Sequence, residues 1–223
     1  RWYPNGRGVV VPLVFDIAPY RDLPGPELAR KAFDIDRSKP VVLFLSRVHV
    51  KKGVHILVET AKLLTERGID AQFLIAGTGD EDYANQIKQQ IASCNLESRV
   101  RMLGMVKGTE KLSLYQAADV FALPTSQENF GFVLPEALAC MTPAITTKGV
   151  DIWPELEGSG SSVIAEQNAE AFAAAITKLL QDETRRREMG SKGRDWVLTT
   201  LDPEVVSGRY ASLYKEASQT IAR

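Results

Sequence analysis

Two glutamates, Glu128 and Glu136, have seven residues between them at a point where the chain turns into a helix. Pro135 suits a first helical turn, so the pattern predicts a helix that begins within about one turn before it. The N–H groups of residues 131–133 would then bind an anion, and Gly131 would let a phosphate or sugar approach the backbone closely. One carboxylate can accept hydrogen bonds from both hydroxyls of a vicinal diol. The alternative is a solvated loop charge at Glu128 and a favourable helix-start carboxylate at Glu136.

Positive charges gather in the loop that follows the first strongly apolar run. Arg47, Lys51 and Lys52 lie in this loop, and Gly77 and Gly79 follow the next apolar run. Cations beside small residues favour an anionic ligand that lies close to the backbone, and a phosphate or diphosphate is the simplest such ligand. Lys51 is also typical of a solvated surface, and the two glycines are also typical of an ordinary turn.

Two familiar phosphate-binding motifs are absent. The cationic loop has no Gly-x-Gly-x-x-Gly, and the chain has no Gly-x-x-x-x-Gly-Lys-Ser/Thr. No cluster of histidines and cysteines has metal-ligand spacing. We therefore expect neither a metal nor another cofactor. The two histidines are interpreted as a structural residue (His55) and a solvated one (His49).

The elements that position these residues follow from six short apolar runs. Such runs are typical of strands buried on both faces of a parallel sheet, whereas the amphipathic stretches between them have helical spacing. The alternation predicts a doubly wound α/β domain with right-handed crossovers. The expected strands are 41–45, 71–76, 100–103, 120–123, 144–146 and 162–164. The expected helices are 27–33, 54–64, 83–92, 110–118, 136–140, 169–180, 183–198 and 203–217.

The loops after the strands of such a sheet meet at one edge, where ligands bind. We therefore expect the cationic loop, the glycine turn and residues 128–136 to lie together at that edge.

Composition limits the classes of protein. The chain has 223 residues, 44% hydrophobic and 25% charged, and a net charge of −1, so it is globular and lacks the basic excess of a nucleic-acid-binding protein. No run approaches the ~20 apolar residues of a membrane span, and there is no signal peptide. Cys94 and Cys140 fit reduced thiols of a cytoplasmic protein. The chain begins with Arg1, so we expect a piece of a longer protein.

Residues 128–136 resemble the Glu-x7-Glu motif of family 4 retaining glycosyltransferases, which have the GT-B fold. Further segments resemble that family in the same order and spacing: the loop Ser46-Arg47-x4-Lys52-Gly53, the turn at 75–79, the helix and strand at 114–125, and the tail segments 187–190 and 210–215. The resemblance covers about residues 40–217, most of the chain.

This resemblance implies the donor-binding, C-terminal half of a two-domain enzyme. Residues 39–200 would form its Rossmann-like domain, residues 1–38 an inter-domain connector and lead-in helix, and residues 201–223 a helix that packs back toward an N-terminal domain. That missing domain would bind the acceptor, a glycan or a lipid-linked sugar. The implied activity is hexosyl transfer from a nucleotide-diphosphate sugar in polysaccharide biosynthesis. The implied location is the cytoplasm, and attachment to the cytoplasmic membrane face stays open.

The resemblance also implies residue roles. Arg47 and Lys52 would hold the donor diphosphate and Glu128 would face the donor sugar, so these three are the implied catalytic residues. Glu136 would hold the ribose hydroxyls. The other donor-binding positions would act through their backbone: Asn129, Phe130, Gly131 and Phe132 for sugar hydroxyls, Val133 for a phosphate, Val106 for the base, and Gly79 in its turn.

The sequence departs from the family in two places. Ser46 replaces the usual glycine, and the loop 147–151 has one glycine where the family often has two, which leaves the outer wall of the sugar pocket undefined. No residue is an evident nucleophile. A non-catalytic nucleotide-binding or interaction module remains an alternative, and the Glu-x7-Glu motif disfavours a GT-B isomerase or phosphorylase. We expect the isolated chain to bind donor without transferring sugar.

Overall fold

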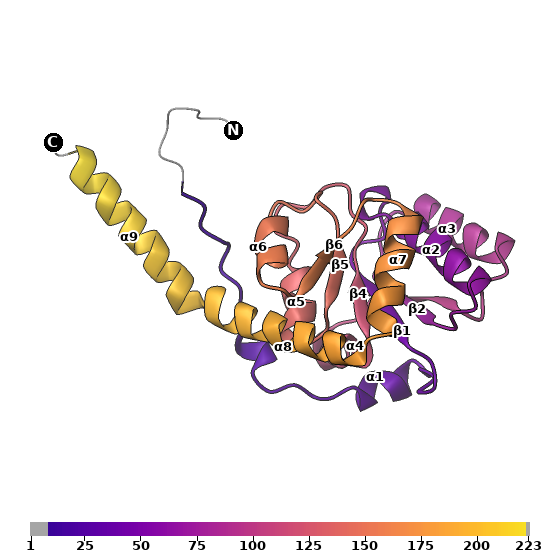
Figure 1. Ribbon diagram of the computed structural model, residues 1–223. Coiled ribbons are helices and arrows are strands. Elements are labelled where there is room, and N and C mark those ends of the chain that lie inside the picture. Colours follow the sequence, from indigo (N-terminus) through magenta and orange to yellow (C-terminus); the bar gives the residue numbers. More distant parts are fainter. Residues whose placement is uncertain (1–8, 222–223) are drawn as a thin grey trace.

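The computed structural model describes residues 9–221 and contains a six-stranded sheet in the order β3-β2-β1-β4-β5-β6 (Figure 1). Every pair of neighbouring strands is parallel, which confirms the predicted doubly wound α/β fold. The first eight residues of the expected connector and the last two of the expected C-terminal helix lie outside the described residues. The strands are β1 (Val41–Leu45), β2 (Gln72–Ala76), β3 (Val100–Gly104), β4 (Val120–Ala122), β5 (Ala144–Thr146) and β6 (Ser162–Ile164).

Helices cover both faces of the sheet. α2 packs against α3 and α7 in one layer, while α4 packs against α1 and α5 in the other, with α8 against α5 (Figure 1). The helices are α1 (Glu27–Ala32), α2 (Val54–Glu66), α3 (Glu81–Ser93), α4 (Gly108–Ala117), α5 (Val133–Ala139), α6 (Trp153–Gly158), α7 (Ala169–Leu180), α8 (Glu183–Thr200) and α9 (Pro203–Ile221). The expected helices are all present. α6 was not predicted, because its six residues include Pro154 and Gly158 and show no clear apolar period.

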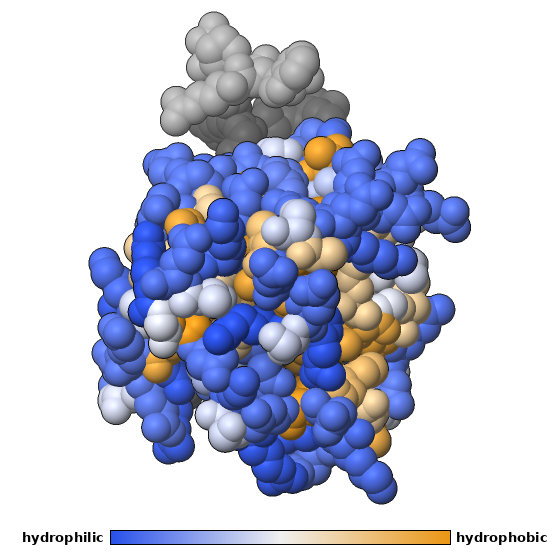
Figure 2. All heavy atoms as spheres, turned by 90° about the vertical axis from the view of Figure 1, so that its right-hand side faces the viewer, coloured by the Kyte–Doolittle hydropathy of each residue, from blue (hydrophilic) through white to orange (hydrophobic). Residues whose placement is uncertain are grey.

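The core lies between the sheet and these layers. β2 and β4 are buried along their whole length, which explains why their residues, apart from Gln72, are apolar without alternation. Phe44, Phe121 and Phe172 are among the largest fully buried side chains. The outer face on which α2 and α3 lie is mostly hydrophilic, with smaller apolar patches (Figure 2).

Side-chain caps mark the starts of several helices. The Asp80 carboxylate accepts the N–H of Tyr83 at 2.8 Å at the start of α3, and Asn168 and Asp182 cap α7 and α8 in the same way. α5 differs, because its N-terminus has no side-chain cap. It begins two residues after Gly131, close to the predicted position.

α9 extends away from the domain (Figure 1). Val206 near its start is buried, whereas most of its later side chains as far as residue 219 are exposed. The contact of this helix with an N-terminal domain stays a prediction. Between residues 9 and 221, no helix has the length and apolar character that crossing a bilayer requires.

Two isolated parallel bridges extend the sheet beyond its strands, at the edge where the site was predicted. Val48 pairs with Gly79, and Glu128 pairs with Val150. The N–H of Glu128 donates to the carbonyl of Gly149 at 2.8 Å. A Cβ on Gly79 would lie 2.2 Å from the Val48 carbonyl oxygen, so only glycine allows this pairing. The loops of the predicted site are therefore held by the sheet itself.

Candidate functional site

The cationic loop leaves β1 and folds back over the rim of the sheet. It forms a single turn of 3₁₀ helix, η2 (Val50–Lys52), which was not predicted, and passes through Gly53 into α2. Gly53 has a φ of 70°, and a Cβ there would lie 2.2 Å from the carbonyl oxygen of Pro124. The glycine therefore brings this loop against the loop after β4, which carries Glu128.

Hydrogen bonds join these two loops. The carbonyl oxygen of Lys51 accepts the N–H of Ser126 at 2.8 Å and the hydroxyl of Thr125 at 3.0 Å. The exposed ammonium of Lys51 donates to the side-chain oxygen of Gln127 at 2.9 Å. Lys51 thus has a structural role through its main chain that its sequence context does not indicate.

The ammonium of Lys52 contacts the carboxylate of Glu128 in this junction. The side chain of Lys52 is 7% exposed and that of Glu128 is 24% exposed. Burial, together with the positive charges of Arg47 and Lys51, lowers the pKa of Lys52, while the adjacent carboxylate favours its charged form. Because little water screens this cation, it can interact strongly with a second anion.

A hollow of about 460 Å³ opens above this ion pair. Three cations and one carboxylate line it, so its charge suits a ligand that carries more than one negative charge. The exposed Arg47 has room to meet such a ligand. The lining residues are Arg47, His49, Lys51, Lys52, Gln127, Glu128 and Asn129. The structure therefore brings together the three implied catalytic residues and one of the donor-binding positions.

Glu136 does not line this hollow, and its carboxylate has partners of its own. The ammonium of Lys111 donates to one oxygen at 2.9 Å, and the hydroxyl of Tyr115 donates to the other at 2.9 Å. Tyr20, in the one-turn helix η1 (Ala18–Tyr20), which was also not predicted, lies nearby. Burial and then the charge of Glu136 strongly raise the pKa of Tyr20. Sequence reasoning missed these three partners; the spacing of Lys111 and Tyr115 was the available signal, since residues i and i+4 share a helix face.

Gly131 separates the two glutamates and shapes the segment between them. Its φ is 67°, and a Cβ there would lie 2.8 Å from the Cγ of Glu128. Phe130 on one side is buried and Phe132 on the other is exposed, with their ring centroids 5.0 Å apart. Phe132 also stacks on Phe15 at 6.3 Å. Phe15, in the part of the chain expected to be a connector, is therefore packed against the segment between the two glutamates.

Three further predicted positions, Gly79, Val106 and Val133, do not line the hollow above the ion pair. Gly79 forms the bridge with Val48 that extends the sheet. Val106 is buried just after β3, next to the exposed Met105. Val133 is half-buried and begins α5.

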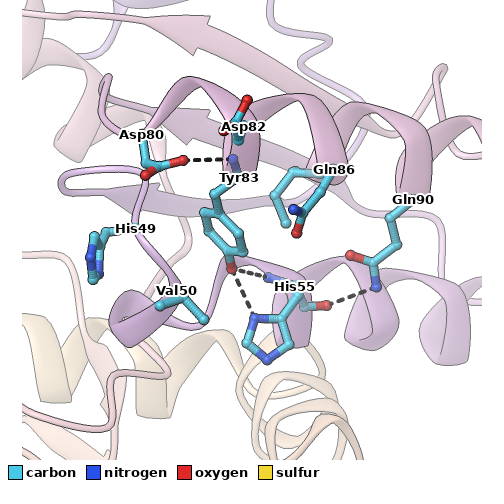
Figure 3. A pocket seen from close by; sticks show the side chains of 9 residues that line it. His49, Val50, His55, Asp80, Asp82, Tyr83, Gln86 and Gln90 are labelled. Carbon is cyan, nitrogen blue, oxygen red and sulfur yellow. Dashed lines mark hydrogen bonds between the residues drawn. The ribbon is translucent and has the colours of Figure 1, made fainter.

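A second hollow, of about 480 Å³, lies between α2 and α3 beside the cationic loop (Figure 3). Several of its polar groups bond to one another. The hydroxyl of Tyr83 lies 2.8 Å from Nδ1 of His55, and the side chain of Gln90 donates to the His55 carbonyl at 3.3 Å. Nδ1 of His49 accepts the N–H of Lys51 at 3.2 Å. These contacts tie α3 to α2 and give His55 the structural place expected of it.

Among the residues that the structure describes, no group of three or more His, Cys, Asp or Glu side chains is arranged to hold a metal ion.

Known proteins share this sequence and fold. The pattern of the family Glycosyl transferases group 1 matches residues 27–196. The D-inositol 3-phosphate glycosyltransferase of Kineococcus radiotolerans is 31% identical over 200 residues, which cover 82% of this chain and 46% of that protein. The crystal structure of Anabaena Alr3699/HepE in complex with UDP and glucose has a TM-score of 0.80 and 23% identity, covering 93% of this chain and 56% of that one.

A solved structure of a single C-terminal domain also has this fold. The C-terminal domain of the glycosyl transferase group 1 family protein LpcC from Francisella tularensis has a TM-score of 0.73 and 20% identity, with 84% of this chain and 98% of that one covered. The chain thus spans about half the length of the Kineococcus and Anabaena proteins. It belongs to the glycosyl transferases group 1, a family of enzymes, and has the Rossmann-like fold of the C-terminal domain of GT-B glycosyltransferases.

Proposed function

We propose that this chain is the donor-binding domain of a retaining glycosyltransferase that moves a hexosyl group from a nucleotide-diphosphate sugar to an acceptor hydroxyl. The observation that carries the proposal is the Lys52–Glu128 pair in a hollow that also contains Arg47. One buried cation, one accessible cation and one carboxylate are the groups needed to hold a diphosphate beside a sugar.

The donor diphosphate binds Arg47 and Lys52. The Lys52 ammonium has three N–H donors, so it can bind a phosphate oxygen while it stays in contact with Glu128. As the glycosidic bond breaks, the departing nucleoside diphosphate gains negative charge. Fixed cations at this point stabilise the transition state more than the ground state. The two side chains thereby supply positive charge, and we propose transfer without a metal.

The rest of the donor follows the rim of the sheet. Glu128 faces the sugar, whose hydroxyls also bind the amides of residues 129–132, and the amide of Val133 binds a phosphate. Glu136 accepts the ribose hydroxyls, and the backbone at Val106 meets the base. UDP is the first nucleotide to test, because Anabaena HepE was crystallised in complex with UDP and glucose.

The acceptor, a glycan or a lipid-linked sugar, binds a separate N-terminal domain. Residues 1–38 form the inter-domain connector and lead-in helix, residues 39–200 bind the donor, and residues 201–223, which include α9, pack back toward that domain. The full enzyme works in the cytoplasm or at the cytoplasmic face of the membrane. Positioning the acceptor hydroxyl contributes about 7–11 kcal/mol to such a reaction, so the isolated chain binds donor without transferring sugar.

Calorimetric titration of the chain with UDP, GDP and ADP tests donor binding. We expect one nucleotide to bind weakly, and Arg47→Ala to weaken its binding by about 1.5–3 kcal/mol, the range for a charged hydrogen bond. Arg187→Ala is the matched control, because Arg187 is an exposed arginine on α8 that pairs with Glu183. Absence of heat with all three nucleotides would support a non-catalytic interaction module instead.

A second assay tests whether the isolated chain can transfer sugar without the acceptor-binding domain. The chain is mixed with nucleotide-sugar donors and candidate acceptors, and released nucleotide is followed. Acceptor-dependent release at an ordinary enzymatic rate would contradict the two-domain assignment.

A further inference from the structure

Two side chains of α4 hold the carboxylate of Glu136, one at each oxygen. Lys111 and Tyr115 donate to Oε1 and Oε2 at 2.9 Å each. Being four residues apart on α4, they present their donors on one face of that helix. The Glu136 side chain is 15% exposed, so a ligand can still reach it.

Packing fixes the direction of the Tyr115 hydroxyl. Tyr115 is fully buried and its ring meets that of Phe121 edge to face, with centroids 5.6 Å apart. The main chain at this position is also held, because its carbonyl oxygen accepts the Thr142 hydroxyl at 2.6 Å. A hydroxyl on so constrained a ring can hold the carboxylate in one orientation only.

Stability alone gives little reason for this arrangement. A buried ion pair is often no more stable than apolar side chains of similar volume, because both charges must leave water. An oriented carboxylate does help recognition: its two oxygens can together accept about four hydrogen bonds, so acceptor capacity remains beyond Lys111, Tyr115 and the neighbouring Tyr20. Two fixed oxygens match two adjacent hydroxyls.

We propose that Lys111 and Tyr115 are positioning residues for ribose recognition, which orient the Glu136 carboxylate toward the 2′- and 3′-hydroxyls of the bound nucleotide. The inference rests on the proposed function, in which Glu136 accepts those hydroxyls. It predicts that both side chains affect binding only when the ligand has the hydroxyls.

The test compares the nucleoside diphosphate that binds the wild-type chain with its 2′,3′-dideoxy analogue. Lys111→Met keeps the aliphatic stem and removes the donor, Tyr115→Phe removes only the hydroxyl, and Lys111→Arg retains a charged donor. We expect Lys111→Met and Tyr115→Phe each to weaken binding of the ribonucleotide by about threefold to tenfold, as for one hydrogen bond, and to leave binding of the dideoxy analogue unchanged. Lys111→Arg should keep most of the wild-type affinity for the ribonucleotide, because it retains a charged donor. Circular dichroism checks that each variant is folded.

The outcomes separate the two proposals. The positioning role would be overturned if Lys111→Met and Tyr115→Phe lost affinity equally for both ligands, or lost none for the ribonucleotide. The donor-binding function would then still stand. If Glu136→Gln weakens neither ligand, or if the wild-type chain binds no nucleotide, the proposed function fails and this inference fails with it.

Discussion

Lys52 and Glu128 form an ion pair across a sequence separation of 76 residues, and the lysine is the more buried partner. The pair joins the loop after β1 to the loop after β4, the two strands between which the strand order reverses. In an open α/β sheet this reversal is where ligands bind. The position of the pair therefore follows from the topology, whereas the contact itself depends on the glycine at position 53.

The unequal burial of this pair predicts unequal effects of its removal. Glu128→Gln leaves the buried Lys52 ammonium beside Arg47 and without a carboxylate, so we expect a loss of about 2–4 kcal/mol in the free energy of unfolding. Lys52→Met leaves a carboxylate that water can reach, so its loss should be about 1 kcal/mol. The double variant should resemble Lys52→Met in urea denaturation. Equal and additive losses would show that the two charges do not interact.

The lowered pKa of Lys52 predicts a pH dependence of stability. The unfolded lysine keeps its proton up to its usual value of 10.5, whereas the folded one releases it earlier. Between these two values the unfolded state binds more protons, so this group raises the free energy of unfolding as pH rises. The free energy of unfolding is measured against pH, up to about 10.5, for the wild type and for Lys52→Met. The difference, wild type minus variant, should rise with pH. Lys62→Met is the control, because Lys62 is an exposed lysine on α2 that pairs with Glu66, and the same slope for that variant would contradict the assignment.

Gly79→Ala should destabilise the rim of the sheet. Its Cβ would lie 2.2 Å from the Val48 carbonyl, and backbone there cannot move aside cheaply, so we expect a loss of about 1–3 kcal/mol. Gly158→Ala is the matched control, because nothing lies within 4 Å of a Cβ at that helical position. Thermal unfolding of both variants measures the difference, and similar melting temperatures would refute the prediction.

The two cysteines should differ in reactivity. Burial, and then the charge of Glu136, raises the pKa of Cys140 to about 12, so this thiol carries almost no thiolate at pH 8. Cys94 is only half-buried. Titration with a chromogenic disulfide at pH 8 should detect one thiol in the native chain and two in urea. Cys140→Ala should leave the native count unchanged, and a fall in that count would contradict the prediction.

Most of the fold could be predicted because its inner strands, β1, β2, β4 and β5, are almost wholly buried. Continuous apolar runs identify such strands directly, and the run at 41–45 coincides with β1. The helix α6 lacks any comparable signal, because Trp153, Pro154 and the glycine at its end break the helical period. Short elements at the rim are stabilised by their surroundings, which no local pattern records.

The site could be predicted as a place but not as a set of contacts. Topology brings Lys52 and Glu128 to one edge, but their pairing depends on the close approach of two loops. That Glu128 and Glu136 serve one donor site stays a prediction. Their separate partners were not predicted: Lys52 for Glu128, and Lys111 and Tyr115 on α4 for Glu136. Side-chain orientation on a helix, and not spacing along the chain, decides which partner each carboxylate meets.

The bridges of Val48 with Gly79 and of Glu128 with Val150 have a consequence for how such a site can evolve. Ordering a loop when a ligand binds lowers affinity, because the loop loses conformational entropy. Here ladder hydrogen bonds have already ordered the main chain, so its shape depends little on the side chains it carries, apart from close-approach glycines such as Gly79. Substitutions on this rim can therefore change which ligand it fits while the scaffold stays the same, so a new ligand preference requires new side chains but no new fold.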